Sequence, residues 1–268
     1  MKQQSLLVVI VNYKKNISEI EIINNKVFPK KNFQIMLWDN LPTQDNLEQA
    51  DNYNIDFYYP CYINQSMSKI YNYAINKHKN NVDYFIFFDN DTLVDEKYVK
   101  KLLFLITKFP SIELFLPVIK SHKKIISPAK LYFTFGFAFK NLQEGIYKSK
   151  NISAINSGMI IKSKYFKNTN FLYDPNLGFY CTDTYFMKKY AKENKHLYIF
   201  TTEISHDLSL FNDESMQRVR FRFFDFKKGL KIIYQDNFFL SILCKLFLFY
   251  LTVKKSIKYK HNFFQRTN

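Results

Sequence analysis

The stretch Tyr84-Phe85-Ile86-Phe87-Phe88-Asp89-Asn90-Asp91-Thr92-Leu93 runs from five apolar residues directly into a pair of aspartates. A continuous aromatic and β-branched run of this length predicts a strand buried on both faces, as in a parallel or mixed sheet. Ligands of open α/β sheets bind outside the carboxyl ends of the strands, which is where Asp89 and Asp91 fall.

Side chains two residues apart in an extended backbone point to the same side, so these two carboxylates can be directed at one ion. Mg²⁺ and Mn²⁺ prefer hard oxygen ligands and are often shared between carboxylates and substrate phosphates. The stretch therefore predicts a metal–diphosphate site. The alternative is a solvated turn in which an Asp caps the next helix, since Asp and Asn are ordinary turn and N-cap residues.

Length and composition set the broad class of the protein. The 268 residues, 47% of them hydrophobic, are enough for one large domain or two small ones. Five glycines cannot supply a G-x-G-x-x-G or Walker A loop, which argues against Rossmann dinucleotide and P-loop sites. The cysteines, Cys61, Cys181 and Cys244, are far apart and odd in number, so we expect neither a disulfide framework nor a zinc knuckle, and a reducing, cytosolic setting.

The formal net charge of +16 is typical of proteins that bind nucleic acid, anionic membrane or acidic substrates. An AT-rich codon bias toward Lys and Asn is the simpler alternative. At the N-terminus, the apolar run Leu6–Val11 is too short for a signal segment or a membrane-spanning helix, so we expect a buried strand and no export.

Strands and helices alternate through the first part of the chain. We expect strands at Leu6–Val11, Phe33–Trp38, Ile55–Tyr59 and Tyr84–Phe88, and helices within Ile17–Val27, Gln44–Tyr53, Ser66–Lys77 and Asp95–Thr107. This alternation predicts βαβ units and a largely parallel sheet. After Pro117 we expect strands at Leu131–Phe139, Ala154–Ile161 and Leu197–Thr201, and a helix over Asp183–Lys192. From Ser215 the chain reads as helical, which indicates one domain with a helical C-terminal appendage.

Polar or aromatic residues follow each early strand. Asn12 and Tyr13 end the first, Asp39 ends the second, and the paired aspartates end the fourth. In a parallel sheet these ends share one edge and can surround one ligand. There Tyr13 can stack on a flat base, Asp39 can accept an N–H from that base, and Asp91 can hold the metal. The three ends together predict a nucleotide-diphosphate pocket.

The order and spacing of these motifs resemble a family-2 glycosyltransferase of the GT-A fold, nearest the bacterial rhamnosyl- and galactofuranosyltransferase-like branch. The resemblance covers about residues 5–210. It rests on Val9-Ile10-Val11-Asn12-Tyr13, Trp38-Asp39-Asn40, Asn64-Gln65-Ser66 leading to Asn72, Phe88-Asp89-Asn90-Asp91, Asn156-Ser157-Gly158-Met159, Gly178-Phe179-Tyr180-Cys181-Thr182-Asp183 and the late His206.

The resemblance implies a role for each matching residue. Base and nucleotide contacts fall to Asn12, Tyr13, Asp39, Asn64, Asn72 and Asp89. Asp91 and His206 would hold Mn²⁺ or Mg²⁺, and Asp183 would be the catalytic base. The chain departs from the family pattern at Ser66 and Ala74, where many members have glycine, and at Thr182, where many have Glu or Asp. These departures bear on the pocket's shape and on the base assignment.

Asp183 opens a helix after an aromatic loop, and a carboxylate at a helix N-terminus is stabilised as the anion. It would take the proton of an acceptor hydroxyl while the metal neutralises the departing diphosphate. Small groups at Asn156, Ser157 and Gly158 would lie beside the donor sugar; Tyr173, Phe179 and Tyr180 would line an acceptor subsite. The alternatives are that Asp183 is only a cap, that His206 is structural, that residues 156–158 form an ordinary turn, and that the aromatic positions arose by chance.

The C-terminal region combines apolar bulk with lysines. Phe238 to Val253 is apolar apart from Lys245 and is shorter than a spanning helix. Lys254, Lys255 and Lys258 follow it. This pattern predicts an interfacial helix on an anionic membrane leaflet, with a helix packed against the catalytic domain as the alternative.

With these features, the resemblance implies a metal-dependent, inverting hexosyl- or deoxyhexosyltransferase at the cytoplasmic membrane face. It would move a sugar from a nucleotide-diphosphate donor to a growing, lipid-linked surface glycan such as capsule, O-antigen or exopolysaccharide. Residues 1–212 would form the catalytic domain, with a nucleotide-sugar half (1–118) and an acceptor half (119–212), followed by a basic helical region (213–268). The alternatives are a basic nucleic-acid-binding protein and a nucleotidyltransferase that uses the paired aspartates.

Overall fold

The computed structural model describes residues 3–121, 124–139, 141–206 and 215–265. Its first part alternates strands and helices, as the sequence predicts. The elements are β1 (Leu6–Tyr13), η1 (Ile17–Glu19), α1 (Glu21–Asn24), β2 (Phe33–Asn40), α2 (Gln44–Gln49), η2 (Ala50–Asn52), β3 (Phe57–Cys61), α3 (Met67–His78), β4 (Tyr84–Asp89), β5 (Thr92–Leu93) and α4 (Glu96–Lys108). Asp95 caps α4, because its carboxylate accepts from the backbone nitrogen of Tyr98 at 2.9 Å.

The rest of the described chain is richer in short strands than the sequence indicates. Its elements are β6 (Leu114–Ser121), β7 (Lys124–Ser127), β8 (Ala129–Tyr132), β9 (Phe135–Ala138), β10 (Gly145–Lys148), β11 (Ile152–Ser153), β12 (Met159–Lys162), α5 (Ser163–Thr169), α6 (Thr182–Glu193), β13 (His196–His206), α7 (Met216–Tyr234) and α8 (Phe238–Tyr259).

Two expected strands are wrong in detail. Leu131–Phe139 is a hairpin of β8 and β9, which turns at Phe133 with a positive φ of 55°. Ala154–Ile161 is strand only at its end, in β12. The expected strand Leu197–Thr201 lies in the first half of the longer β13.

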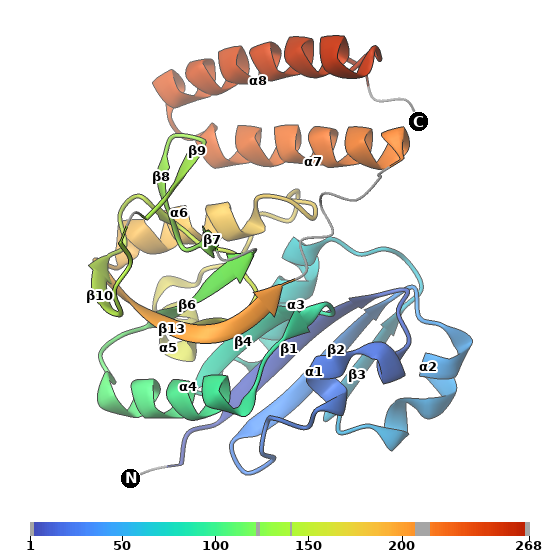
Figure 1. The fold of residues 1–268 in the computed structure, drawn as a ribbon, viewed down its shortest axis with the longest axis vertical. Coiled ribbons are helices and arrows are strands. Elements are labelled where there is room, and N and C mark those ends of the chain that lie inside the picture. The colour runs from blue at the N-terminus through green and yellow to red at the C-terminus, as the bar shows by residue number, and fades with distance from the viewer. Residues whose placement is uncertain (1–2, 122–123, 140, 207–214, 266–268) are drawn as a thin grey trace.

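The central sheet has the order β10-β13-β6-β12-β4-β1-β2-β3, with β5 beside β13 and β7 beside β6 (Figure 1). β1 pairs in parallel with both β2 and β4, and β2 with β3. Antiparallel β12 lies between β4 and β6, so both parts of the chain share one sheet. The α/β class and the GT-A-like mixed sheet predicted from the sequence are confirmed.

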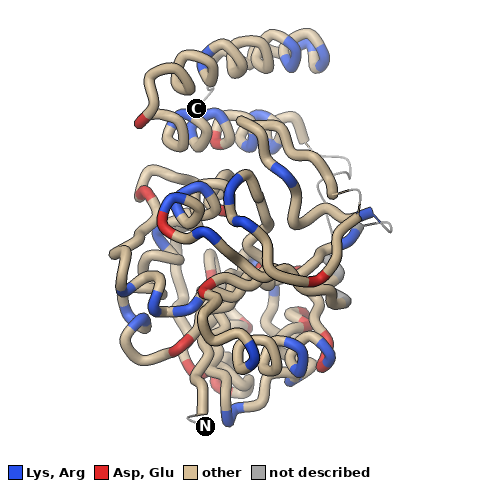
Figure 2. The backbone as a smooth tube through the Cα atoms, turned by 90° about the vertical axis from the view of Figure 1, so that its left-hand side faces the viewer, with Lys and Arg blue, Asp and Glu red and all other residues tan. Residues whose placement is uncertain are grey.

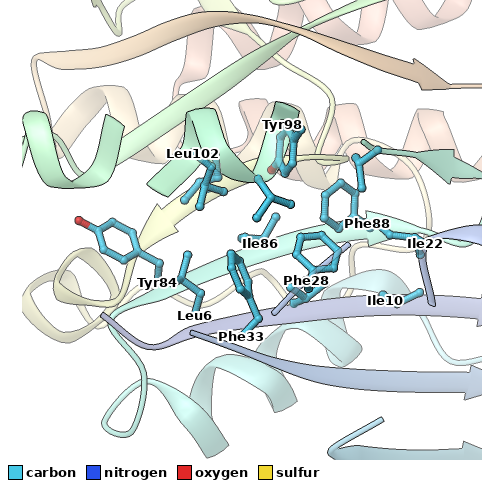
Figure 3. Packing of buried hydrophobic residues seen from close by; sticks show 14 of the residues in the cluster. Leu6, Ile10, Ile22, Phe28, Phe33, Tyr84, Ile86, Phe88, Tyr98 and Leu102 are labelled. Carbon is cyan, nitrogen blue, oxygen red and sulfur yellow. The ribbon is translucent and has the colours of Figure 1, made fainter. Parts of the chain in front are cut away.

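Alternate residues of β1 pack into two cores, one on each face of the sheet. One face packs against α1 and α4, in a cluster that includes Leu6, Phe28, Phe88 and Leu102 (Figure 3). The other, which includes Leu7 and Val9, packs against α3, α5 and α6. Burial on both faces explains the unbroken apolar runs of β1 and β4.

The C-terminal helices α7 and α8 form an antiparallel pair at one end of the molecule, with α8 outermost (Figure 1). Leu230, Tyr234, Cys244 and Leu248 are buried between them. No helix among the described residues is long and apolar enough to cross a bilayer. Cys61, Cys181 and Cys244 are all free, as expected.

Candidate functional site

The site lies where the strand order reverses direction. β2 and β3 extend from one side of β1, whereas β4 lies on the other, and ligands of open α/β sheets bind at such a switch point. The register places Asn12 beside Asp39 and Val11 beside Asp89 at the carboxyl ends. The sheet therefore brings the three predicted strand ends together.

Asp39 is the centre of a buried polar network, and its side chain is fully inaccessible to solvent. Its carboxylate accepts from Asn12 Nδ2 at 2.9 Å, Asn46 Nδ2 at 2.8 Å and the Tyr58 hydroxyl at 3.0 Å. Burial and the adjacent Asp39 charge raise the pKa of Tyr58 far above its usual value, so the phenol stays a donor. Asp39 thus ties β1, α2 and β3 to the carboxyl end of β2 from within the protein.

The network extends to the DxD segment, since Asn90 Nδ2 donates to Asn12 Oδ1 at 2.7 Å. Tyr13, next along β1, is 48% exposed and available for stacking against a planar base. Asn64 is exposed in the loop before α3. Asn72 instead pairs with the backbone of Tyr173, donating to its carbonyl and accepting from its nitrogen at 2.8 Å each.

Asp89 is held by two hydrogen bonds to Ser157, which is fully buried. The Ser157 hydroxyl accepts from the Asp89 backbone nitrogen at 3.1 Å and donates to Asp89 Oδ2 at 3.0 Å. The Ser157 hydroxyl also lies 2.9 Å from that of Thr92. The segment that resembles a donor-sugar loop therefore positions the first aspartate of the DxD pair.

The carboxyl end of β13 meets the DxD segment, because His206 pairs with Thr92 in the β13–β5 ladder. Its backbone is thus one residue away in register from Asp91, and the role of the two residues at a metal stays a prediction. The His206 side chain lies outside the described part of the structure. Among the described residues, no cluster of three or more His, Cys, Asp or Glu side chains is suited to a metal.

A pocket of about 140 Å³ joins the two halves of the predicted site. Asp89 from β4 and Asp183 from the start of α6 both line it. Its other walls come from α3, the residues before β12 and the loop before α6, namely Met67, Tyr71, Ile155, Asn156, Phe179, Tyr180, Cys181 and Thr182. Residues from both parts of the chain thus face one shared space.

Asp183 lies in an environment that disfavours the charged form of its carboxyl group. Burial raises the pKa of its carboxyl, and the negative charge of Asp89 adds to this, while hydrogen bonds from Thr184 act in the opposite direction. Asp183 Oδ1 accepts from the Thr184 backbone nitrogen at 2.6 Å. The like charges of Asp183 and Asp89 favour a bound cation or a proton between them.

Two further polar groups line this pocket. Asn156 Nδ2 donates to the Thr182 hydroxyl at 3.0 Å, and the Asn156 side chain also lies beside the buried Tyr71 hydroxyl. Asn156 Oδ1 makes no hydrogen bond to any described residue, and because a buried polar atom without a partner costs free energy, it is suited to accept from a hydroxylated ligand. Tyr71 had no sequence signal, since its position on α3 reads as core.

The loop before α6 is held by the C-terminal helix α7. Asp225 Oδ2 accepts from the backbone nitrogens of Phe179 and Tyr180, at 2.8 and 2.9 Å, and Arg222 Nε donates to the Tyr180 hydroxyl at 2.6 Å. Tyr180 and Phe179 therefore stand at the pocket, as expected. Tyr173 does not line it, because it is 1% exposed in the core beside Tyr71.

Sequence reasoning missed the supports of the site, Asn46, Tyr58, Tyr71, Arg222 and Asp225. Asn46 and Tyr58 carry no motif that distinguishes them from other helix and strand residues. Asp225 had a usable signal, because it is the one carboxylate of α7, flanked by Arg222 and Lys227.

No protein-family profile and no curated protein matches this sequence. Among solved structures, the chain resembles TarS of S. aureus with a TM-score of 0.64 and 15% identity, over 87% of this chain and 39% of that one. TarS 1–349 in complex with UDP gives a TM-score of 0.58 and 14% identity, over 85% of this chain and 65% of that one. The UDP-GlcNAc complex gives 0.57 and 15%, with the same coverages of 85% and 65%.

At these identities the likeness establishes a shared fold. The chain spans 39% of the length of the larger TarS structure. The TarS-like GT-A fold is the one that the sequence resemblance implied, whereas the rhamnosyl- and galactofuranosyltransferase-like branch stays a prediction.

Proposed function

We propose that this protein is a glycosyltransferase that moves a sugar from a nucleotide diphosphate to a hydroxyl of a glycan acceptor. The observation that carries the proposal is the shared pocket of Asp89 and Asp183 at the topological switch point. Transfer from a diphosphate is helped by a cation that neutralises the leaving group and by a carboxylate that takes the proton of the attacking hydroxyl. Asp89 on β4 would serve the first role through a bound cation, and Asp183 on α6 would serve the second.

The donor is proposed to lie across the ends of β1 and β4. Tyr13 stacks on the base, and the network around Asp39 fixes the loop that surrounds it. UDP-GlcNAc is the first donor to test, because TarS, which shares the fold, has been crystallised with it. The identity of the sugar would depend on Asn156 and Tyr71, whose polar side chains both line the pocket.

The donor set fits a divalent cation. Asp89 and Asp91 offer hard carboxylate oxygens at the end of β4, and β13 brings the backbone of His206 to the same segment. We propose that Asp91 and His206 hold Mn²⁺ or Mg²⁺, with Asp89 beside it. When bound, such an ion neutralises charge on the diphosphate leaving group.

The proposed reaction is a single displacement. The acceptor oxygen attacks the anomeric carbon as the bond to the diphosphate oxygen breaks, and the hydroxyl proton passes to Asp183. Attack from the face opposite the leaving group inverts the anomeric centre. Burial of Asp183 strengthens it as a base, since its raised pKa increases its affinity for the proton.

The acceptor is proposed to be a lipid-linked glycan, reached from an anionic membrane surface through α8. The solvent-facing stripe of α8 is apolar, and its exposed members are Phe239, Ile242, Leu243, Leu246, Phe249, Tyr250 and Ile257. Phe239, the most exposed, is 80% accessible. Lysines flank this stripe, and Lys and Arg far outnumber acidic residues on α7 and α8 (Figure 2). Such a helix binds in the plane of an anionic interface.

Donor binding is tested with a panel of nucleotide sugars, each with and without Mn²⁺, by thermal shift. A selective, metal-dependent rise in melting temperature identifies the donor. Product analysis then separates the classes of enzyme: a glycosyltransferase releases the nucleoside diphosphate, whereas a nucleotidyltransferase releases pyrophosphate. No stabilisation by any nucleotide sugar would contradict the proposal.

Membrane attachment is tested by flotation with anionic vesicles. Replacing Leu246 and Phe249 with serine on the outer face of α8 should abolish flotation without unfolding the protein. The matched control is Tyr62→Ser, which alters a large exposed residue far from α8 along the chain and should leave flotation unchanged. If wild-type protein does not float, the membrane role is wrong.

A further inference from the structure

A second pocket, larger than the first, lies between α6 and the turn that joins α7 to α8. Its volume is about 420 Å³. The second half of α6 forms one wall, the residues at β11 form another, and Asp236, Asn237 and Leu240 close the third. None of these residues takes part in the transfer site described above.

The charged groups that line this pocket are strongly unbalanced. Lys150, Lys188, Lys189 and Lys192 all border it, against the single carboxylate of Asp236. Asp236 lies 3.5 Å from Lys189 and leaves the other three lysines without a nearby carboxylate in the lining. Four positive charges around one concave space favour a multivalent anion such as a phosphate.

Lys188 is the most enclosed of these lysines. Its Nζ lies 4.7 Å from the centre of the Tyr234 ring, which fixes the ammonium by a cation–π contact. Partial burial lowers the pKa of Lys188, and the positive charge of Lys192 lowers it further. An anion bound between the two ammonium groups would offset this repulsion.

The pocket also has an apolar wall, to which Leu131, Ile152, Met187, Ile233 and Leu240 contribute. The N-terminus of α8 opens onto it, where Asn237 Oδ1 caps the backbone nitrogen of Leu240 at 3.0 Å. The N-terminal end of a helix carries partial positive charge, which favours an anion there. Lysines, a helix end and an apolar wall together fit a phosphate attached to an apolar chain.

The exposed apolar stripe of α8 begins at this pocket. Phe238 and Phe239 are 73% and 80% exposed and directly precede Leu240, which lines it. Figure 2 faces this side of the molecule and shows Lys and Arg on α6, α7 and α8. A molecule in the pocket would therefore sit where the proposed membrane surface meets the domain.

We propose that this pocket binds the phosphate group of a membrane amphiphile, held by Lys188 and Lys192. The inference rests on the proposed membrane attachment and gives it a specific site. The ligand class is a phosphate monoester on an apolar tail. Because α6 carries Asp183 at its start, Lys188 is only about 7.5 Å further along the helix axis, at a rise of about 1.5 Å per residue. A bound phosphate would thus anchor the helix that carries the base.

The test compares two pairs of substitutions with equal charge loss. Lys188→Gln with Lys192→Gln alters the pocket, and Lys254→Gln with Lys258→Gln alters the far end of α8. Each full-length protein is floated with vesicles made of a neutral carrier lipid and one anionic lipid. The anionic lipid is either phosphatidic acid, which is a phosphate monoester, or phosphatidylglycerol, which is a diester, and the two vesicle types have the same surface charge.

We expect the pocket pair to lose affinity for phosphatidic acid vesicles by about tenfold or more, and the α8 pair to lose a smaller, equal amount on both vesicle types. Equal losses for both pairs on both vesicles would overturn the specific site. Titration with inorganic phosphate, monitored by NMR of the lysine side chains, distinguishes a lipid phosphate from free phosphate as the ligand. Tight binding of free phosphate would overturn the membrane ligand in favour of a soluble one.

A second readout keeps this proposal separate from the transferase. Donor binding by thermal shift should be the same in all variants, since the lysines lie outside the donor pocket. Lost donor binding in wild type would contradict the proposed function but not the phosphate site. If the pocket pair loses binding to phosphatidic acid vesicles but keeps donor binding, the result supports the phosphate site without bearing on the transferase.

Discussion

The carboxylate of Asp225 on α7 accepts a hydrogen bond from the backbone nitrogen of Tyr180 at 2.9 Å, across 45 residues of sequence. The same oxygen accepts from Phe179 at 2.8 Å. Because these amides precede the N-terminus of α6, where Asp183 lies, the C-terminal helix pair fixes the loop that presents the proposed base. The appendage is thus part of the site's architecture.

Asp225→Ala should lower the turnover of the proposed transfer by about tenfold or more, because two partly buried amides lose their acceptor and the loop is no longer held. Donor affinity should change little, since Tyr13 and the Asp39 network are on other elements. Steady-state kinetics and donor calorimetry measure the two effects. Asp51→Asn, an exposed carboxylate on η2, is the control; an unchanged turnover in Asp225→Ala would remove the positioning role.

Two glycines allow α7 to approach this loop. A Cβ at Gly229 would lie 2.8 Å from Cys181 Cβ and 3.1 Å from the Tyr180 carbonyl oxygen, and one at Gly178 would overlap Asp225. These close approaches explain why glycine occurs at a helix interior position, where it ordinarily costs about 1 kcal/mol relative to alanine.

Gly229→Ala should therefore lower the melting temperature and turnover, despite its better helix propensity, because α7 must move away from the loop. Gly136→Ala is the matched control, since a Cβ there meets nothing within 4 Å. Differential scanning fluorimetry and transfer assays on both proteins check this. A Gly229→Ala protein that is more stable and fully active would show that the helix and loop are not in tight contact.

The central features of the site could be predicted because each follows from local pattern. The apolar run of β4 fixes where Asp89 and Asp91 emerge, and the aromatic loop before α6 marks Asp183. The contacts of Asn46 and Asp225 could not be predicted, since they depend on how distant elements dock. The β8–β9 hairpin was missed because its turn at Phe133 contains no Asn-Gly or similar signal.

Asp91→Asn should abolish metal-dependent donor binding while the fold is retained. The substitution removes the anion but keeps the shape, and a cation shared between a carboxylate and a diphosphate loses its charged ligand. Calorimetry of donor nucleotide with and without Mn²⁺ measures the effect. Asp95→Asn, which can still cap α4, is the control, and unchanged metal-dependent binding in Asp91→Asn would place the metal elsewhere.

The rate of transfer should depend on the protonation of Asp183. Burial raises the pKa of this carboxyl above that of an ordinary aspartate, so it becomes protonated, and unable to accept a proton, at higher pH than usual. Turnover should therefore fall on the acid side from a higher pH than the ordinary aspartate range. The pH profile of kcat checks this; an acid limb at or below the usual aspartate pKa would contradict the buried environment.

The raised pKa of Asp183 also makes the stability of the fold depend on pH. A carboxyl whose pKa is raised on folding binds its proton more tightly in the folded state, so ionising it as the pH increases costs folding free energy. Asp183→Asn, which is neutral at every pH, should therefore gain stability relative to wild type toward neutral pH and lose this advantage in acid. Urea denaturation at several pH values measures the difference.

Asp183→Asn should also separate binding from chemistry. Asparagine keeps the size of the side chain and an oxygen that can accept from the Thr184 backbone nitrogen, so the start of α6 is preserved. The donor contacts lie on β1, β2 and β4, so affinity for donor and metal should be retained. Turnover should fall by about 10²- to 10⁴-fold, the range for losing acid–base assistance.

Single-turnover kinetics together with donor calorimetry distinguish the outcomes, because lost turnover with retained affinity identifies a base. Near-normal rates would move that role to another carboxylate, with Asp174 or Asp207 the next to test; Asp207 is outside the described residues. Loss of donor affinity would instead make Asp183 part of the donor site.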